Sequence, residues 1–141
     1  MPPFELVTSV SAIPFTQDGR IVIVRLTKRG LDIPGGHVEP YETTPLETLN
    51  REVMEEATMT IRDAMLAKVI ESDFYDDKKS YLLLYTCFVN ELFKFEPNDE
   101  SSERLIMTVK EFIDNYNAGD KELMEHVITN AWKKIKNVDI I

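Results

Sequence analysis

Three glutamates stand close together on one short stretch, where their spacing could support metal chemistry. Glu52, Glu55 and Glu56 are related by adjacency and by i,i+3 and i,i+4 spacing, so a helix of about 3.6 residues per turn would place them on one acidic arc. Carboxylates this close repel one another and weaken a helix. A hard divalent cation relieves the repulsion, because Mg²⁺ and Mn²⁺ prefer crowded oxygen ligands. On charge alone, a solvated acidic face is the simpler interpretation. The surrounding residues must therefore show whether these glutamates bind a metal.

The residues before the arc predict the helix that would carry it. Thr44 is a suitable N-cap, Pro45 suits the first helical position, and Glu47 stands three residues after the cap, which is the pattern of a capping box. The glycine loop Gly35-Gly36 comes shortly before this helix. An apolar stripe at three- and four-residue spacing is expected to face a core. Its members are Leu46, Leu49, Val53 and Ala57.

The same stretch resembles the Nudix box, G-x5-E-x7-R-E-U-x-E-E-x-G-U, in which U is an aliphatic residue. Two departures are visible: eight residues rather than seven separate Glu42 from Arg51, and Thr58 replaces the last glycine of the box. The resemblance covers about 25 residues directly. Together with the strand order expected around these residues, it covers most of the chain. Eight positions match in type, namely Gly36, Glu42, Arg51, Glu52, Val53, Glu55, Glu56 and Met59.

The resemblance implies an enzyme that hydrolyses a nucleoside diphosphate linked to another moiety, with Mg²⁺ or Mn²⁺ as cofactor. Glu55 and Glu56 are then expected to bind the metal, helped by the backbone carbonyl of Gly36. Glu52 is either a further ligand or the general base that activates water. Arg51 is expected to orient the carboxylates through charge-assisted hydrogen bonds.

The neighbouring loops offer further candidates. Glu42 is expected to brace its loop against the N-terminus of the helix, although the extra residue could displace it. Lys28 and Arg29 form a basic turn before the acidic centre and are candidates to contact substrate phosphates. His37 is a candidate for contact with the edge of the substrate. For Lys28, Arg29 and His37, an ordinary surface or structural role is the alternative interpretation.

A fourth carboxylate is expected from a segment distant in sequence, because two glutamates cannot fill the octahedral shell of Mg²⁺. The resemblance implies an acidic residue in the loop before a late strand. We select Glu103, because it lies three residues before Ile106, which stands where the family's E-x-x-W pattern has an aromatic. An acidic loop without a dedicated ligand is the alternative. The candidates in this loop are Glu96, Asp99, Glu100 and Glu103.

Thr58 raises a separate question about how the helix ends. A glycine at this point often takes the left-handed conformation, which costs a β-branched residue about 1–2 kcal/mol. Either the helix of this chain ends differently or Thr58 is strained.

Length and charge bound the function. At 141 residues the chain is expected to form one domain, residues 1–141, that buries about two-thirds of its surface. The formal net charge of −9 argues against nucleic acid as a partner. Anionic phosphates remain suitable substrates, because a bound metal ion cancels the local charge.

Cysteine usage and hydropathy predict the compartment. Cys87 is the only cysteine, so no internal disulfide can form, which fits a reducing cytoplasm. We expect no signal peptide and no membrane span, since no apolar run approaches 18 residues. The apolar tail, Val138 to Ile141, is expected to dock either on the body of the domain or on a second subunit, as in a homodimer.

The remaining pattern predicts an α/β fold. The first two strands should form a hairpin, and the two long strands a second hairpin at the sheet centre, interrupted near Arg62-Asp63. A mixed β-sheet between helices follows, as in the α/β/α sandwich of the Nudix family. The expected strands are Phe4 to Phe15, Arg20 to Leu26, Leu31 to Ile33, Met59 to Phe74, Tyr81 to Phe93 and Leu105 to Met107, with later helices at Val109 to Asn117 and Lys121 to Lys136.

Two functions of different classes fit these features. The first is a metal-dependent pyrophosphohydrolase acting on nucleotides, for example a sanitising enzyme of the MutT kind. The alternative is a non-catalytic nucleotide-binding or regulatory module of the same fold. Such modules usually lose one or more of the helix carboxylates. Because Arg51, Glu52, Glu55 and Glu56 are all present, the sequence favours the enzyme.

Overall fold

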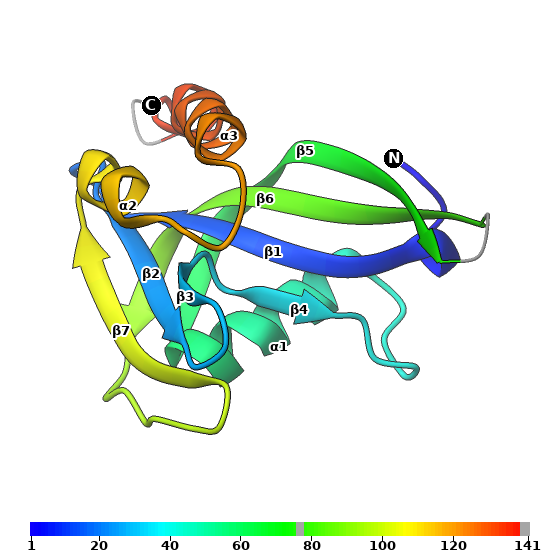
Figure 1. The fold of residues 1–141 in the computed structure, drawn as a ribbon, viewed down its shortest axis with the longest axis horizontal. Helices are drawn as coiled ribbons and strands as arrows, with labels where there is room; N and C mark the ends of the chain where they lie inside the picture. The colour runs from blue at the N-terminus through cyan, green and yellow to red at the C-terminus, as the bar shows by residue number, and fades with distance from the viewer. Residues whose placement is uncertain (76–77, 139–141) are drawn as a thin grey trace.

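The chain folds around one mixed β-sheet with helices on both faces (Figure 1). The computed structural model describes residues 1–75 and 78–138, and the side chains of residues 1–72 and 79–138. The predicted α/β class and the α/β/α sandwich are confirmed. The elements are η1 (Phe4–Leu6), β1 (Val7–Phe15), β2 (Ile21–Leu26), β3 (Gly30–Asp32), β4 (Gly35–His37), α1 (Pro45–Ala57), β5 (Met59–Tyr75), β6 (Lys78–Leu92), β7 (Ser101–Met107), α2 (Val109–Asn115) and α3 (Lys121–Ile135).

Strand β1 is the centre of the sheet, whose order is β3-β2-β1-β6-β5 with β7 beside β2. It pairs in parallel with β6, from Val7 opposite Tyr81 to Phe15 opposite Phe88. On its other edge β1 meets β2 only at Phe15 and then pairs with β4. The second hairpin was expected at the sheet centre, but only β6 lies there and β5 forms an edge. The change of partner along β1 brings the glycine loop of β4 against the central strand.

Two apolar cores lie on the two sides of this sheet. Strand β2 shows how one strand serves both, because successive side chains point to opposite faces. Ile21 and Ile23 join the core on the side of α2 and α3, whereas Val22 and Val24 join the core on the side of α1. Both faces of β2 are buried, which explains its continuous apolar sequence.

Helix α1 begins and ends with signals that were visible in the sequence. Thr44 accepts a hydrogen bond from Glu47 N at 3.3 Å, and the Glu47 carboxylate accepts from Thr44 Oγ1 and from Thr43 N and Oγ1, where a full capping box would use the backbone N–H of Thr44. Leu46 was expected on the core stripe but is exposed, so the buried stripe begins at Leu49. At the other end, Thr58 has φ 51° and ψ 54°. The helix therefore ends in the left-handed conformation, and of the two alternatives the strained threonine is the correct one.

Several element boundaries differ from the prediction. The first three residues of the expected first strand form η1, and β7 begins at Ser101, so the expected loop is shorter. Strand β5 is interrupted as predicted, because its register with β6 shifts beyond Arg62 and Asp63 has φ 57°. Helices α2 and α3 end at Asn115 and Ile135, slightly before their predicted ends.

The remaining predictions concern segments that are described only in part. The polar residues Asp76 to Ser80, between the two long strands, predict a turn; residues 76–77 lie outside the described residues and 78–80 belong to β6. Of the apolar tail only Val138 is described, and it packs against the core beside α3. Within the described part of the chain, no helix is both long and apolar enough to span a membrane.

Candidate active site

A cleft of about 790 Å³ lies where β1 changes its pairing partner. Its lining differs between the side of α1 and the side of α3. The α1 side is acidic and includes Glu52, Glu55 and Glu56, with Glu100 from the segment before β7. The α3 side is largely aliphatic. Its lining there includes Ile70, Leu82, Leu84, Leu123, Met124 and Val127, with Tyr116 and Asp120 beside them.

The glycine loop borders the acidic side because only glycine allows so close an approach. A Cβ on Gly35 would lie 2.5 Å from the Cα of Ser11 in β1. A Cβ on Gly36 would lie 2.6 Å from the carboxylate oxygens of Glu52. Real Cβ atoms do not approach other atoms this closely, so the Gly36 backbone is held directly against the acidic arc. Gly35 N donates to Glu56 Oε1 at 2.8 Å and thereby connects loop and helix.

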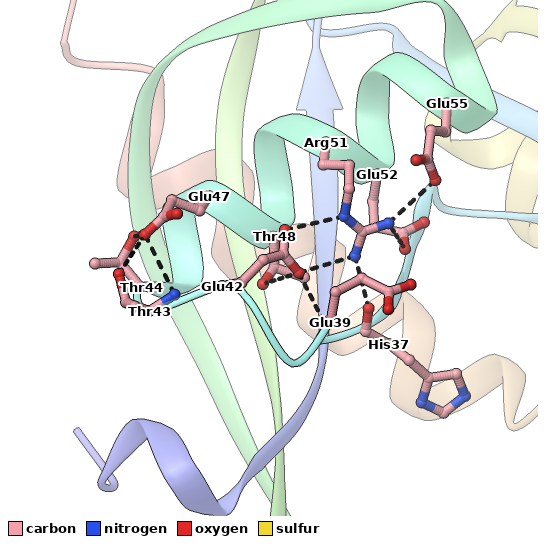
Figure 2. Close-up of polar contacts among 10 residues, drawn as sticks. All are labelled: His37, Glu39, Glu42, Thr43, Thr44, Glu47, Thr48, Arg51, Glu52 and Glu55. Carbon is pink, nitrogen blue, oxygen red and sulfur yellow. Dashed lines mark hydrogen bonds and ion pairs between the residues drawn. The ribbon is translucent and has the colours of Figure 1, made fainter.

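Arg51 is the centre of the polar network, as Figure 2 shows. Its Nε and Nη2 donate to the two carboxylate oxygens of Glu42 at 2.9 and 3.0 Å. Its Nη1 donates to Glu52 at 2.8 Å and to Glu55 at 3.1 Å, and Nη2 also reaches the His37 carbonyl at 2.8 Å. These bonds raise the pKa of Arg51. One guanidinium thus connects the loop of β4 to two carboxylates of the acidic arc.

Glu42 ties the loop before α1 to the helix despite the extra residue in that loop. Its carboxylate is buried and accepts hydrogen bonds from Glu39 N at 2.8 Å and Thr48 Oγ1 at 3.0 Å, besides those from Arg51. The Arg51 hydrogen bonds are the main reason that the pKa of Glu42 is lowered to about 2. The contacts go to side chains of the first turns of α1, not to the free N–H groups at its start.

Glu52 and Glu56 are both buried at the edge of the cleft. Burial raises the pKa of Glu56 to about 7, the Gly35 N–H opposes this, and the charges of Glu52, Glu100 and Asp32 add to it. Burial also raises the pKa of Glu52, against the opposing effect of Arg51. Two desolvated carboxylates that repel each other are costly to keep ionised.

A divalent cation would remove this cost, and the residues present suit one. As the side chains lie, no three His, Cys, Asp or Glu groups among the described residues converge on a common metal position. The reason is that Glu52 and Glu55 bond to Arg51, whereas Glu56 bonds to Gly35 N. The donor set is nevertheless all oxygen, crowded and partly desolvated, with the Gly36 backbone against it, which is the chemistry of a hard-cation site.

The structure does not bring Glu103 to this cluster. Glu103 lies opposite Arg25 in the β2–β7 pair, and the two form an ion pair of 2.9 Å at the surface. Side chains of a strand alternate between faces. Arg104 points to the end of α1 and Leu105 packs on the α3 side, so Glu103 faces away from α1. Our choice of Glu103 is therefore wrong in position, and Glu100 lines the cleft instead.

The three residues proposed to contact substrate are placed differently. Arg29 lines the cleft and forms a 2.6 Å ion pair with the buried Asp32. His37 also lines the cleft, and its Nδ1 lies 3.4 Å from Ser9 Oγ. Lys28 is exposed and does not belong to the cleft lining. Sequence reasoning missed Asp32, although a carboxylate between Leu31 and Ile33 in a short apolar strand was a usable signal.

Comparison with known proteins identifies the class. A sequence model of the NUDIX domain matches residues 5–127, so the chain belongs to the Nudix family and is a Nudix hydrolase. A comparison with curated proteins found no match.

Solved structures similar to this chain share its fold. A NUDIX hydrolase from Nitrosomonas europaea superposes with a TM-score of 0.73 at 19% identity, covering 91% of this chain and 88% of that one. For a mutant of the Bacillus subtilis pyrophosphohydrolase BsRppH the TM-score is 0.74 at 21% identity, with 99% and 87% covered. The MutT protein from Methanosarcina mazei gives 0.66 at 20% identity, with 92% and 96% covered.

Proposed function

We propose that this Nudix hydrolase uses Mg²⁺ or Mn²⁺ to cleave the pyrophosphate of a nucleoside diphosphate linked to another moiety. The observation that carries the proposal is the cleft, in which Glu52 and Glu56 are buried beside the Gly36 backbone. The descriptions of similar structures as a pyrophosphohydrolase and a MutT protein support the same reaction class.

The residues on the α1 side would hold the metal. Glu52, Glu55 and Glu56 offer carboxylate oxygens, and Gly36 offers its carbonyl. Glu100 takes the place first given to Glu103, because it lines the cleft and its charge acts on Glu52 and Glu56. When bound, the cation would neutralise charge on the pyrophosphate oxygens and lower the pKa of a coordinated water.

The protein groups would act on the substrate and on the attacking water. Arg51 holds Glu52 and Glu55 in fixed positions through its two Nη1 hydrogen bonds. Glu52 either accepts the proton of the attacking water or serves only as a ligand. Arg29 extends an exposed guanidinium into the cleft, where it can contact a substrate phosphate. His37 borders the same cleft and is proposed to contact the substrate edge. The aliphatic α3 side would receive the moiety beyond the phosphates.

The test is hydrolysis of a substrate panel by the purified protein. The panel contains nucleoside triphosphates, dinucleoside polyphosphates and nucleotide sugars, each with Mg²⁺, Mn²⁺ or EDTA. We expect phosphate or pyrophosphate release that EDTA abolishes and that Glu56→Gln lowers by a factor of hundreds or more. Turnover that persists in EDTA would contradict the metal requirement, and no turnover with any substrate would contradict the reaction class.

Two matched substitutions examine the assignments within the site. Glu100→Gln should weaken Mg²⁺ dependence, whereas Glu103→Gln should not, because Glu103 pairs with Arg25 away from the cleft. Glu52→Gln should lower the rate while retaining metal affinity if Glu52 is mainly the base. Equal effects of the Glu100 and Glu103 substitutions would remove the loop carboxylate from the site.

The remaining parts of the proposal rest on the sequence. A single domain acting in a reducing cytoplasm fits the lone cysteine, Cys87, which is buried. The net charge of −9 continues to argue against nucleic acid, and we propose no membrane partner. A homodimer through the apolar tail is proposed as an alternative to a monomer. Light scattering of the protein with and without residues 138–141 separates these two states.

A further inference from the structure

The C-terminal end of α1 carries Glu55 and Glu56 but lacks the glycine that usually organises such an end. The last carbonyls of a helix have no partner within the helix, and a glycine cap supplies backbone N–H groups that wrap back to them. Here the chain turns at Thr58 and enters β5 directly at Met59. Among the described residues beyond the helix, Thr58 alone returns a backbone N–H to it, bonding to Met54 O at 3.0 Å, and Thr58 O accepts from Phe93 N at 3.0 Å. The carbonyls of residues 55–57 therefore need partners from elsewhere.

Side chains between residues 98 and 104 supply those partners in sequence order. Asn98 Nδ2 donates to Glu55 O at 3.0 Å, and Ser101 Oγ donates to Glu56 O at 2.9 Å. Arg104 Nη1 donates to Ala57 O at 2.8 Å and to Thr58 O at 3.0 Å. The C-terminal clamp, defined as Asn98, Ser101 and Arg104, thus reaches all four carbonyls. Two of them belong to the glutamates that border the cleft.

The clamp also fixes the segment that carries Glu100. Asn98 Oδ1 accepts from Glu100 N and from Ser101 N, both at 2.9 Å. Thr27 N donates to Glu100 O at 3.0 Å, which holds the segment against the turn after β2. One amide side chain therefore bonds to the backbone of both Glu55 and Glu100. The end of α1 and the Glu100 segment are held as one unit on the acidic side of the cleft.

We propose that Asn98, Ser101 and Arg104 are positioning residues, which fix the backbone positions from which Glu55, Glu56 and Glu100 turn their carboxylates to one divalent cation. The inference rests on the proposed function, because it assigns those glutamates to the metal. Outer partners of metal ligands commonly change metal affinity when they are removed. The clamp would do this through the backbone carbonyls of Glu55 and Glu56 and through the backbone N–H of Glu100, not through the carboxylates.

The smallest change that tests the clamp is Ser101→Ala, with Ser102→Ala as its matched control. Ser101 is fully buried and bonds to Glu56 O, whereas Ser102 bonds to Arg25 O at 3.3 Å on the exposed β2 side. Both variants lose one hydroxyl from the same strand. Mn²⁺ binding is measured by electron paramagnetic resonance, without substrate, and thermal stability is measured in EDTA.

We expect Ser101→Ala to raise the dissociation constant for Mn²⁺ by about tenfold, and Ser102→Ala to leave it unchanged. Arg104→Met should weaken Mn²⁺ binding as well. Arg104→Lys should restore most of it, because an ammonium group can donate to two carbonyls. Arg104→Lys and Ser101→Ala decide the question if Arg104→Met does not fold.

The outcomes separate the clamp from the proposed function. If the wild type binds Mn²⁺ and Ser101→Ala binds it equally well with a lower melting temperature, the clamp is only structural and the inference is overturned. If the wild type itself neither binds Mn²⁺ nor hydrolyses any substrate, the proposed function fails and the inference fails with it. A selective loss of Mn²⁺ affinity in Ser101→Ala, restored affinity in Arg104→Lys and unchanged affinity in Ser102→Ala support the clamp.

Discussion

Metal-free protein should lose stability as the pH rises from 5 to 8, because of the buried carboxylate of Glu56. The pKa of Glu56 is about 7 in the fold and 4.5 as its ordinary value. Between these values the folded state holds a proton that the unfolded state has released. The folded state therefore binds more protons in this window, and the free energy of unfolding falls as the pH rises.

The magnitude follows from the two pKa values. For a single group whose pKa rises from 4.5 to about 7, the free energy of unfolding falls by about 2.5 kcal/mol between pH 5 and pH 8. Burial also raises the pKa of Glu52, which adds to the effect in the same direction. Glu42, with a pKa of about 2, contributes stability that is present above pH 4.5 and lost at lower pH, so it does not obscure this window.

The assay is urea denaturation in EDTA at pH 5, 6, 7 and 8 for the wild type, Glu56→Gln and Glu55→Gln. The difference between the wild type and Glu56→Gln isolates one carboxylate, because all other titrating groups are shared. We expect Glu56→Gln to be more stable than the wild type by about 2–3 kcal/mol at pH 8. Glu55 is exposed, so Glu55→Gln should keep most of the wild-type slope.

Two results would refute this reasoning. One is that the free energy of unfolding of the wild type, minus that of Glu56→Gln, stays constant or rises from pH 5 to pH 8. The other is an equal flattening of the pH dependence by Glu55→Gln. Added Mg²⁺ should restore wild-type stability more at pH 8 than at pH 5, because protons compete with the metal for the same oxygens. It should not restore Glu56→Gln to the same extent.

Three further predictions concern the backbone and the central arginine. Gly35→Ala should destabilise the protein by about 2–3 kcal/mol in urea denaturation, because the added Cβ meets the Ser11 backbone. Gly36→Ala should mainly lower metal binding and the rate of hydrolysis, because its Cβ displaces the Glu52 carboxylate. Thr58→Gly should raise the free energy of unfolding by up to about 1 kcal/mol by relieving the left-handed threonine, and a lower melting temperature would show that the threonine side chain outweighs the strain. Arg51→Lys should cost about 2 kcal/mol in urea denaturation, because an ammonium group cannot replace the two parallel bonds to Glu42, and unchanged stability would contradict that role.

Local sequence rules predicted the parts of the site that lie on a single element. The N-cap at Thr44 and the acidic arc of α1 depend on spacing within a few residues. Such patterns are legible because a helix fixes which neighbours face one another. The exposed Leu46 shows what such patterns cannot predict. The spacing of the apolar stripe is correct, but its first residue lies beyond the edge of the core.

The parts that sequence reasoning missed depend on contacts between distant segments. Choosing among Glu96, Asp99, Glu100 and Glu103 required knowing that β7 begins at Ser101 and that Glu103 points away from α1, and one residue of register reverses the face of a strand residue. The partners of Arg104 are two carbonyls at the end of α1, which no residue type in the sequence indicates. Similarly, the position of β5 at the sheet edge depends on β6 pairing with β1, not on the hairpin itself.

The parallel pairing of β1 with β6 has a consequence for the order in which the protein is synthesised. Strand β1 begins at Val7, and its partner in β6 begins at Tyr81, about 70 residues later. At about 5–20 residues per second, the ribosome delivers that partner on the order of 4–15 s after β1. During this interval the apolar central strand has an unpaired edge, which is the feature that most readily recruits other chains. The nascent chain therefore carries this unpaired edge until β6 emerges, and the cleft cannot form before that moment, because β6 residues line it.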